Sequence, residues 1–140
     1  MALNVLLLGG YRFVGRALIA AAQARGHAVS AFNRGNLAPL PGVEQLTGDR
    51  NDPAFPAGRT WDVAIDTSGY IPRHVRASAN ALRDRVGQYV FVSSLSVYPF
   101  PMPPGLDETA PVQSLPGGAD PDDAANVETY GARKAVCEAA

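Results

Sequence analysis

The chain has 140 residues, of which 46% are hydrophobic and 18% are charged, so it can form one compact domain with a substantial core. Its net charge of −1 and the lack of any basic or acidic run give no electrostatic reason to expect a nucleic-acid or membrane partner. The single cysteine, Cys137, excludes a disulfide framework within one chain, and two scattered histidines, His27 and His74, do not indicate a metal site. The first residues do not have the pattern of a signal peptide, so we expect a cytoplasmic protein.

Predicted strands and helices alternate along the chain. Residues 3–8 form a short apolar run that ends at glycines, which is typical of a strand buried on both faces of a parallel sheet. The same kind of pattern predicts further strands at 28–32, 43–46, 62–66 and 88–92, and helices at 13–25, 73–85 and 127–140. A segment rich in Pro, Gly and Asp at 99–125 is predicted to be a loop. This alternation predicts an α/β fold, a Rossmann-like doubly wound parallel sheet in the order 3-2-1-4-5, with a nucleotide crevice beside the first strand.

The stretch LLGGYRFVGR, residues 7–16, joins the first strand to the first helix. Its glycines let the chain turn tightly and bring backbone N–H groups against a pyrophosphate, and the helix N-terminus favours an anion. Arg12 stands where a dinucleotide-binding turn usually has its middle glycine. Its guanidinium could bind cofactor phosphates, lie over the adenine side or be solvated. The residues of this turn that we expect to bind a dinucleotide are Gly9, Gly10, Arg12, Phe13, Val14 and Gly15.

The residues after the second strand predict which dinucleotide binds. An acidic side chain at this place would accept hydrogen bonds from a ribose 2′-hydroxyl, but the sequence has Asn33 and Arg34. A carboxylate would repel a 2′-phosphate, whereas a guanidinium can pair with it. The sequence therefore favours NADP(H) over NAD(H), with an ordinary turn residue as the alternative interpretation of Arg34.

Five more candidate cofactor residues follow the next two strands. Asp49 and Arg50 come after the third strand, and Asp49 either accepts a hydrogen bond from an adenine amino group or caps its own turn. Thr67, Ser68 and Gly69 come after the fourth strand, at the end where ligands bind in open α/β sheets. Small residues there leave room for the ribose and the nicotinamide.

A hydroxyl, a phenol and an ammonium form a separate candidate group. Ser94 follows the fifth strand, and Tyr130 and Lys134 are four residues apart in the last predicted helix, so they share one face. The ammonium and a positive nicotinamide ring would favour the phenolate of Tyr130, which could exchange a proton with a substrate hydroxyl or carbonyl. Ser94 could orient the same oxygen, and Lys134 could hold the nicotinamide ribose. The alternative for Tyr130 and Lys134 is an exposed helix pair.

The stretches LLLGGYRFVGRAL, AFNRG, GDR, VFVSSLSVY and YGARK together resemble the N-terminal part of the extended short-chain dehydrogenase/reductase superfamily, in its NAD-dependent epimerase/dehydratase group. The GG-x-R-F-V-G form is similar to an atypical branch that often has N-R-G after the second strand. The resemblance implies that Ser94, Tyr130 and Lys134 are the catalytic residues and that the glycine turn is the phosphate loop. It also implies hydride transfer at a hydroxyl or carbonyl carbon of a small-molecule substrate, for example a nucleotide sugar, either as net redox or within an epimerisation or dehydration.

The resemblance further implies that residues 1–140 are an N-terminal NAD(P)-binding fragment, because family members continue into a sixth strand and a C-terminal substrate domain. We therefore expect the fifth strand to be a sheet edge that promotes a homodimer, and the fragment to be inactive alone. The alternative function is a non-catalytic NADP(H)-binding sensor or an RNA-associated module of the atypical branch. The near-neutral charge offers no basic stripe for RNA and makes that alternative less favoured.

Overall fold

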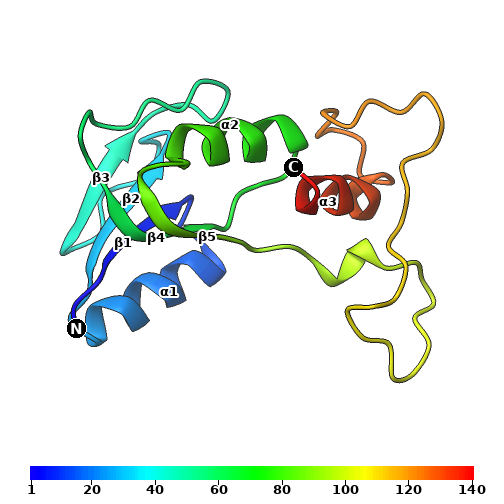
Figure 1. Cartoon of the computed structure of the whole chain (residues 1–140), viewed down its shortest axis with the longest axis horizontal. Helices are drawn as coiled ribbons and strands as arrows, with labels where there is room; N and C mark the ends of the chain where they lie inside the picture. The colour runs from blue at the N-terminus through cyan, green and yellow to red at the C-terminus, as the bar shows by residue number, and fades with distance from the viewer. The chain divides into compact units, whose positions relative to one another are not determined.

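Five parallel strands form one sheet in the order β3-β2-β1-β4-β5 (Figure 1). The strands are β1 Asn4–Leu8, β2 Ala28–Asn33, β3 Val43–Thr47, β4 Trp61–Asp66 and β5 Val86–Phe91. The computed structural model describes residues 1–140 and divides them into two units. The first unit, Met1–Ser68 with Ala77–Val92, contains the sheet, and the second comprises Gly69–Arg76 and Ser93–Ala140. The predicted α/β class and strand order are confirmed.

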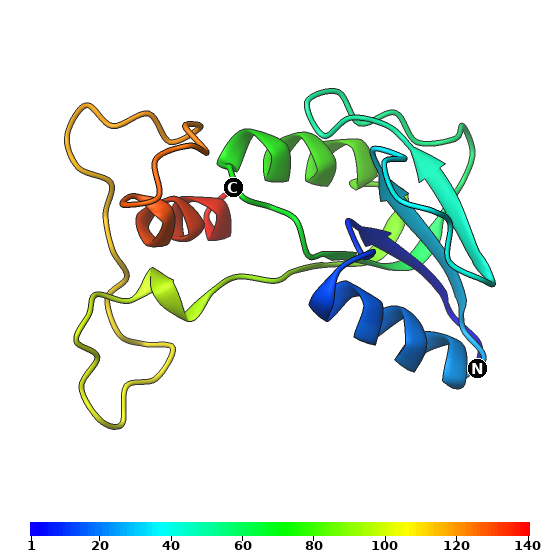
Figure 2. The ribbon, with the colours of Figure 1, turned by 180° about the vertical axis from the view of Figure 1, so that it is seen from behind.

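Helix α1, Phe13–Ala24, covers one face of the sheet (Figure 2). Its apolar residues recur at helical spacing and bring Ile19 into a core cluster with Leu7 and Val29. The central strand β1 is buried along its last four residues, because it is covered on both faces. Gly26, with a φ of 74°, follows the helix in the left-handed conformation that the turn into β2 requires.

The opposite face of the sheet is covered by the C-terminal half of helix α2, Pro72–Leu82, and by an aromatic cluster. Leu82 joins a buried core that includes Leu8 and Phe32. The connection from β3 to β4, residues 48–60, contains no helix. Its Phe55 ring instead lies 4.8 Å from the Phe32 ring and 6.0 Å from the Trp61 ring, measured between centroids. Aromatic packing thus takes the place of a crossover helix at this position.

The second unit is built around a 3-10 turn, η1 Leu95–Val97, and helix α3, Tyr130–Glu138. A side-chain carbon at Gly131 would lie 2.0 Å from the carbonyl oxygen of Ser96, so only glycine lets α3 pack directly on η1. Gln113 holds the same turn, because its amide nitrogen donates to the carbonyls of Ser96 and Tyr98 at 2.8 and 3.1 Å.

Three predicted elements have a boundary that differs from the structure by more than one residue. The last helix was expected over 127–140 but begins at Tyr130, because the Asn126 side chain accepts a hydrogen bond from the N–H of Glu128 and makes a turn there. The helix expected over 73–85 ends at Leu82, whose carbonyl accepts from the N–H of Arg85. The strand expected over 88–92 consequently begins earlier, at Val86.

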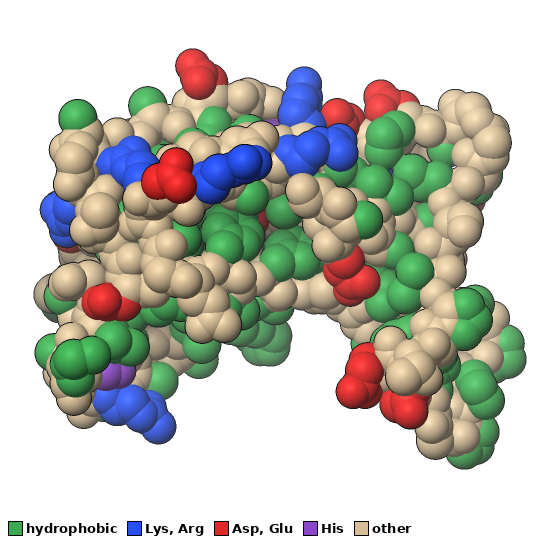
Figure 3. Space-filling view, in the orientation of Figure 1, with side chains coloured by type: hydrophobic (Ala, Val, Ile, Leu, Met, Phe, Trp, Pro, Cys, Tyr) green, Lys and Arg blue, Asp and Glu red, His purple; other side chains and the backbone are tan.

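The surface carries several large hydrophobic side chains, and hydrophobic groups are visible on the face drawn in Figure 3. In the second unit these exposed residues are Tyr70, Leu95, Phe100, Val112 and Val127. None of the helices has the length and apolar character needed to cross a membrane. No three side chains of His, Cys, Asp or Glu gather in an arrangement that could hold a metal ion.

Candidate active site

The turn between β1 and α1 depends on three glycines. Gly9 and Gly10 have φ values of 92° and 90°, a conformation that L side chains rarely adopt. A side-chain carbon at Gly15, in the first turn of α1, would lie 2.3 Å from the Cα of Gly10. The helix can therefore approach the turn this closely only with glycine at position 15, as the dinucleotide-binding interpretation requires.

Several backbone donors in this turn have no acceptor within the chain. The N–H groups of Gly10, Tyr11 and Arg12 donate to no acceptor within the chain. Arg12 is the N-cap of α1 but makes no capping hydrogen bond, and the first turn of the helix contains no acidic residue. The exposed guanidinium of Arg12 has no hydrogen bond or ion pair either. Unpaired N–H groups at a helix N-terminus fit a phosphate or pyrophosphate.

The end of β2 adds a free guanidinium beside a constrained turn. The Asn33 side-chain oxygen accepts a hydrogen bond of 2.7 Å from the N–H of Gly35, while the Asn33 amide nitrogen is buried without a partner. Arg34, between Asn33 and Gly35 in the sequence, is exposed and makes no ion pair or hydrogen bond. A fixed turn with an unpaired arginine and an orphaned amide donor fits an anionic ligand group.

The residues after β3 point in different directions. The carboxylate of Asp49 accepts two hydrogen bonds from Asn51, both at 2.7 Å, which is the turn-capping arrangement that the sequence offered as one alternative. The Arg50 guanidinium instead turns inward and makes a bidentate pair with Asp66, with N···O distances of 2.8 and 2.7 Å. Binding of a cofactor by Asp49 or Arg50 stays a prediction.

Asp66 and Tyr89 belong to this part of the site although the sequence did not single them out. Asp66 is fully buried at the end of β4, and the Tyr89 hydroxyl donates to its carboxylate at 2.8 Å. Burial, followed by the negative charge of Asp66, raises the pKa of Tyr89 well above its ordinary value. Tyr89 therefore stays protonated as a donor. An aspartate at the end of the apolar run DVAID was the only local signal for this cluster.

Thr67 and Ser68 lie against the glycine turn between β1 and α1. The Thr67 hydroxyl donates to the carbonyl of Leu8 at 3.0 Å, and Ser68 accepts from Arg50 at 2.9 Å. A side-chain carbon at Gly9 would lie 2.9 Å from the Thr67 hydroxyl oxygen and 3.0 Å from that of Ser68. The first unit thus brings together the glycine turn, the end of β4 and Arg50.

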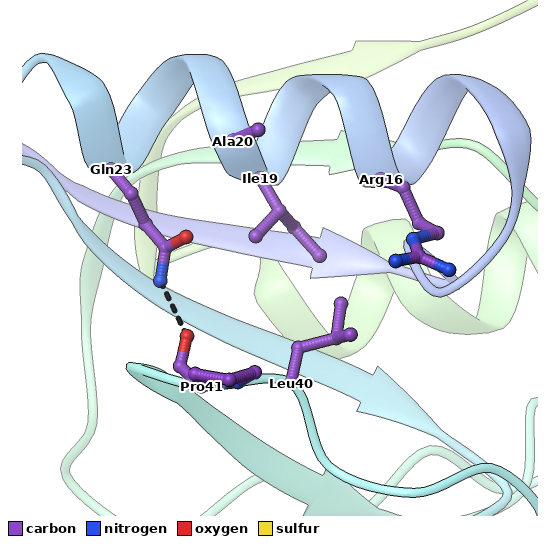
Figure 4. A pocket seen from close by; sticks show the side chains of 6 residues that line it. All are labelled: Arg16, Ile19, Ala20, Gln23, Leu40 and Pro41. Atoms are coloured by element: carbon purple, nitrogen blue, oxygen red, sulfur yellow. Dashed lines mark hydrogen bonds between the residues drawn. The ribbon is translucent and has the colours of Figure 1, made fainter.

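A pocket of about 250 Å³ lies between α1 and the segment that precedes β3 (Figure 4). The side chain of Gln23 donates to the carbonyl of Pro41 at 2.8 Å at one end, and Arg16 lies at the other. The remaining lining residues are Ile19, Ala20 and Leu40. None of the predicted cofactor residues lines this pocket, so we do not assign it to the candidate site.

The second unit contains the predicted catalytic residues. Tyr130 is the first residue of α3 and is half-buried, and its hydroxyl makes no hydrogen bond within the chain. Lys134 is buried, and its ammonium donates to the carbonyl of Gly69 at 2.9 Å. Ser94 is the N-cap of η1 and accepts from the N–H of Ser96 at 3.1 Å. No hydrogen bond joins Ser94 to Tyr130.

A second buried cation, Arg133, fixes the segment that leads into α3. Its guanidinium is 2% exposed and donates to the carbonyls of Asp123 and Asn126 and to the hydroxyl of Thr129, at 2.6, 2.5 and 2.8 Å. No carboxylate pairs with it. These hydrogen bonds hold the segment just before Tyr130 in place. Arg133, which sequence reasoning did not identify, therefore helps to fix where α3 begins.

Comparisons with known proteins agree with this fold. No protein-family model matches the chain. A curated relative, the chloroplast stem-loop binding protein of 41 kDa b from Arabidopsis thaliana, is 31% identical over 68% of this chain and 30% of its own length. A solved UDP-galactose 4-epimerase is 20% identical, with a TM-score of 0.76 over 97% of this chain and 49% of the epimerase. The enzyme WbmG of Bordetella bronchiseptica, solved with NAD and UDP, is 16% identical, with a TM-score of 0.73 over 99% of this chain and 49% of WbmG.

The chain thus spans about half the length of these solved structures and less than a third of the curated relative. Other solved structures that match include proteins described as an NAD-dependent epimerase/dehydratase and as a short-chain dehydrogenase/reductase. These comparisons confirm the resemblance that the sequence predicts, and the chain has the Rossmann-type fold of the NAD-dependent epimerase/dehydratase group within the short-chain dehydrogenase/reductase superfamily.

Proposed function

We propose that the chain forms the dinucleotide-binding part of an NADP(H)-dependent enzyme of the epimerase/dehydratase type, whose substrate is a hydroxyl or carbonyl compound such as a nucleotide sugar. The observation that carries this proposal is the set of unpaired N–H groups at the start of α1 together with the free guanidinium of Arg34. Support for the substrate class comes from the solved structures of similar fold, one a UDP-galactose 4-epimerase and one a complex with NAD and UDP.

Arg34 is the residue that would select NADP(H) over NAD(H). It is exposed and unpaired at the end of β2, where a 2′-phosphate on the adenosine ribose would be held by a bidentate pair. Arg12, also unpaired, would add charge beside the pyrophosphate. The Asn33 side chain fixes the turn, so Arg34 is presented from a defined backbone position.

Titration calorimetry with NADPH and with NADH tests this assignment. Arg34→Ala is expected to weaken NADPH binding by about 10- to 100-fold, which is the value of a charged hydrogen-bonded pair, and to change NADH binding by less than about twofold. Arg25→Ala, which removes an exposed arginine from the far end of α1, is the matched control and should change neither affinity. An equal loss of both dinucleotides in Arg34→Ala would contradict the proposed 2′-phosphate contact.

The second unit would supply the acid–base chemistry. A bound nicotinamide would supply hydride transfer. The chain's own residues would donate or accept the proton on the reacting oxygen. The Tyr130 hydroxyl has no partner within the chain and can give that proton to a carbonyl or accept it from a hydroxyl. Ser94 uses its oxygen as the cap of η1, so its own proton remains free to orient the substrate oxygen. Lys134, held by the carbonyl of Gly69, places a positive charge on the same helix as Tyr130.

A second candidate function is a non-catalytic module that associates with RNA. The observation that favours it is the curated relative, which is a stem-loop binding protein. The net charge of −1 speaks against it, because RNA binding depends on a basic surface. Gel-shift titration with a stem-loop RNA distinguishes the two candidates: this candidate requires micromolar or tighter binding that weakens steeply with salt, and the enzyme proposal requires none.

A further inference from the structure

The buried carboxylate of Asp66 has no capacity left for a ligand. Its Oδ1 accepts from the Arg50 guanidinium at 2.8 Å and from the N–H of Ser68 at 3.0 Å. Its Oδ2 accepts from the guanidinium at 2.7 Å and from Tyr89 at 2.8 Å. Four donors therefore use the four lone-pair positions of the carboxylate. Asp66 is 0% exposed, so the cluster is a fixed internal support rather than a contact surface.

Arg50 and Tyr89 keep their charge states in the ordinary pH range. Arg50 remains a cation, because a guanidinium does not lose its proton in proteins. Burial and the Asp66 charge raise the pKa of Tyr89, so its phenol stays a donor. Arg50 and Tyr89 therefore both remain hydrogen-bond donors to the Asp66 carboxylate.

What the cluster positions is the hydroxyl of Ser68. One nitrogen of Arg50 donates to both Asp66 and the Ser68 oxygen, at 2.8 and 2.9 Å. Because Ser68 accepts from a cation on one side, its own proton must point away from the guanidinium. No acceptor within the chain receives that proton. The Ser68 oxygen lies beside Gly9, since a side-chain carbon at Gly9 would be 3.0 Å from it.

We propose that Arg50 is a positioning residue that turns the hydroxyl proton of Ser68 toward an oxygen in the nicotinamide half of a bound dinucleotide, either of its phosphate or of its ribose. This inference rests on the proposed function. Ser68 is the group that touches the ligand, and Arg50 acts only through it. The assignment to the nicotinamide half follows from the sheet order, in which β4 and β2 flank β1 on opposite sides. With the adenosine end at Arg34 after β2, the other half of the ligand crosses the turn toward β4.

Paired titrations with NADPH and with 2′,5′-ADP, which contains only the adenosine half, test this inference. Ser68→Ala should weaken NADPH binding about tenfold and leave 2′,5′-ADP binding within about twofold of the unmodified chain. The charge-matched double variant Arg50→Gln/Asp66→Asn should reproduce this pattern, and adding Ser68→Ala to it should cause no further loss. Ser30→Ala is the control, because Ser30 is another buried serine that accepts from an arginine, in a different cluster.

Each result decides the inference. The inference would be overturned if Ser68→Ala weakened the binding of NADPH and 2′,5′-ADP equally, or weakened neither. It would also be overturned if the effects of the Arg50 and Ser68 changes on NADPH affinity were additive. Ser68→Ala leaves the Arg50–Asp66 pair intact, so it provides the answer even where the double variant fails to fold. Absence of binding of both ligands to the unmodified chain would instead overturn the proposed function, and the inference with it.

Discussion

Phe13 has a strained backbone conformation and an exposed apolar side chain, and neither favours the folded state. Its φ of 37° lies in the left-handed region, which costs a residue other than glycine about 1–2 kcal/mol. Its side chain is 91% exposed, so packing does not offset that cost. Such strain persists where the surrounding structure fixes the backbone. Phe13 directly follows Gly10, Tyr11 and Arg12, whose N–H groups donate to no acceptor within the chain. We infer that ligand binding, rather than folding, accounts for the geometry at Phe13.

Replacement of Phe13 by glycine tests this interpretation. Phe13→Gly should leave the free energy of unfolding unchanged or raise it by up to about 1 kcal/mol, because relief of strain offsets the greater freedom of the unfolded chain. Ala17→Gly, at an exposed helical position of the same helix, should lower it by about 1 kcal/mol. Urea denaturation measures both values, and an equal destabilisation by the two changes would show that position 13 carries no strain.

At the scale of elements, a polar cluster ties three strands together on the α2 side of the sheet. Ser30 of β2 donates to Glu44 of β3 at 2.6 Å and accepts from the indole N–H of Trp61 in β4 at 3.2 Å. Arg59 pairs with the same carboxylate and lies over the Trp61 ring, 5.6 Å from its centroid. The hydrogen bond from Ser30, then that from Arg59, lowers the pKa of Glu44 below its ordinary value of 4.5.

This lowered pKa predicts an acid-dependent contribution to stability. The folded state binds a proton at Glu44 more weakly than the unfolded state does, so the contribution is present above pH 4.5 and is lost as pH falls through the lowered value. The pair is partly exposed, so Glu44→Gln should cost less than about 1 kcal/mol at pH 7. Urea denaturation at pH 7 and pH 3 should show a smaller difference at pH 3, and a difference that grows at low pH would contradict the assignment.

The elements also show which parts of the fold local sequence patterns can predict. The apolar run of β1, the helical spacing of α1 and the glycine turn between them are signals within 20 residues, and all three were found where expected. The Asp66 cluster depends on partners 16 and 23 residues away, Arg50 and Tyr89, which no local periodicity can pair. The same limit applies to Arg133, because its acceptors are backbone carbonyls with no sequence signal.

At the scale of the whole molecule, β5 is an outer strand of the sheet. Outer strands favour pairing with another chain, so we expect a homodimer to form through β5 as concentration rises. Sedimentation velocity over a range of concentrations measures this association. Gln88→Lys places a charge on an exposed position of the strand and should shift the equilibrium toward the monomer. A monomer at every concentration would contradict the expectation.

The proposed function depends most on the binding of NADP(H) by the glycine turn and the end of β2. Titration of the isotopically labelled chain with NADPH, followed by ¹H–¹⁵N NMR, tests this binding directly because each backbone N–H reports its own surroundings. We expect the largest shifts at Gly9–Gly15 and at Asn33–Gly35, with smaller shifts for NADH at the second group. Saturating NADPH that leaves both groups unchanged, or that shifts only residues elsewhere in the chain, would contradict the proposed function.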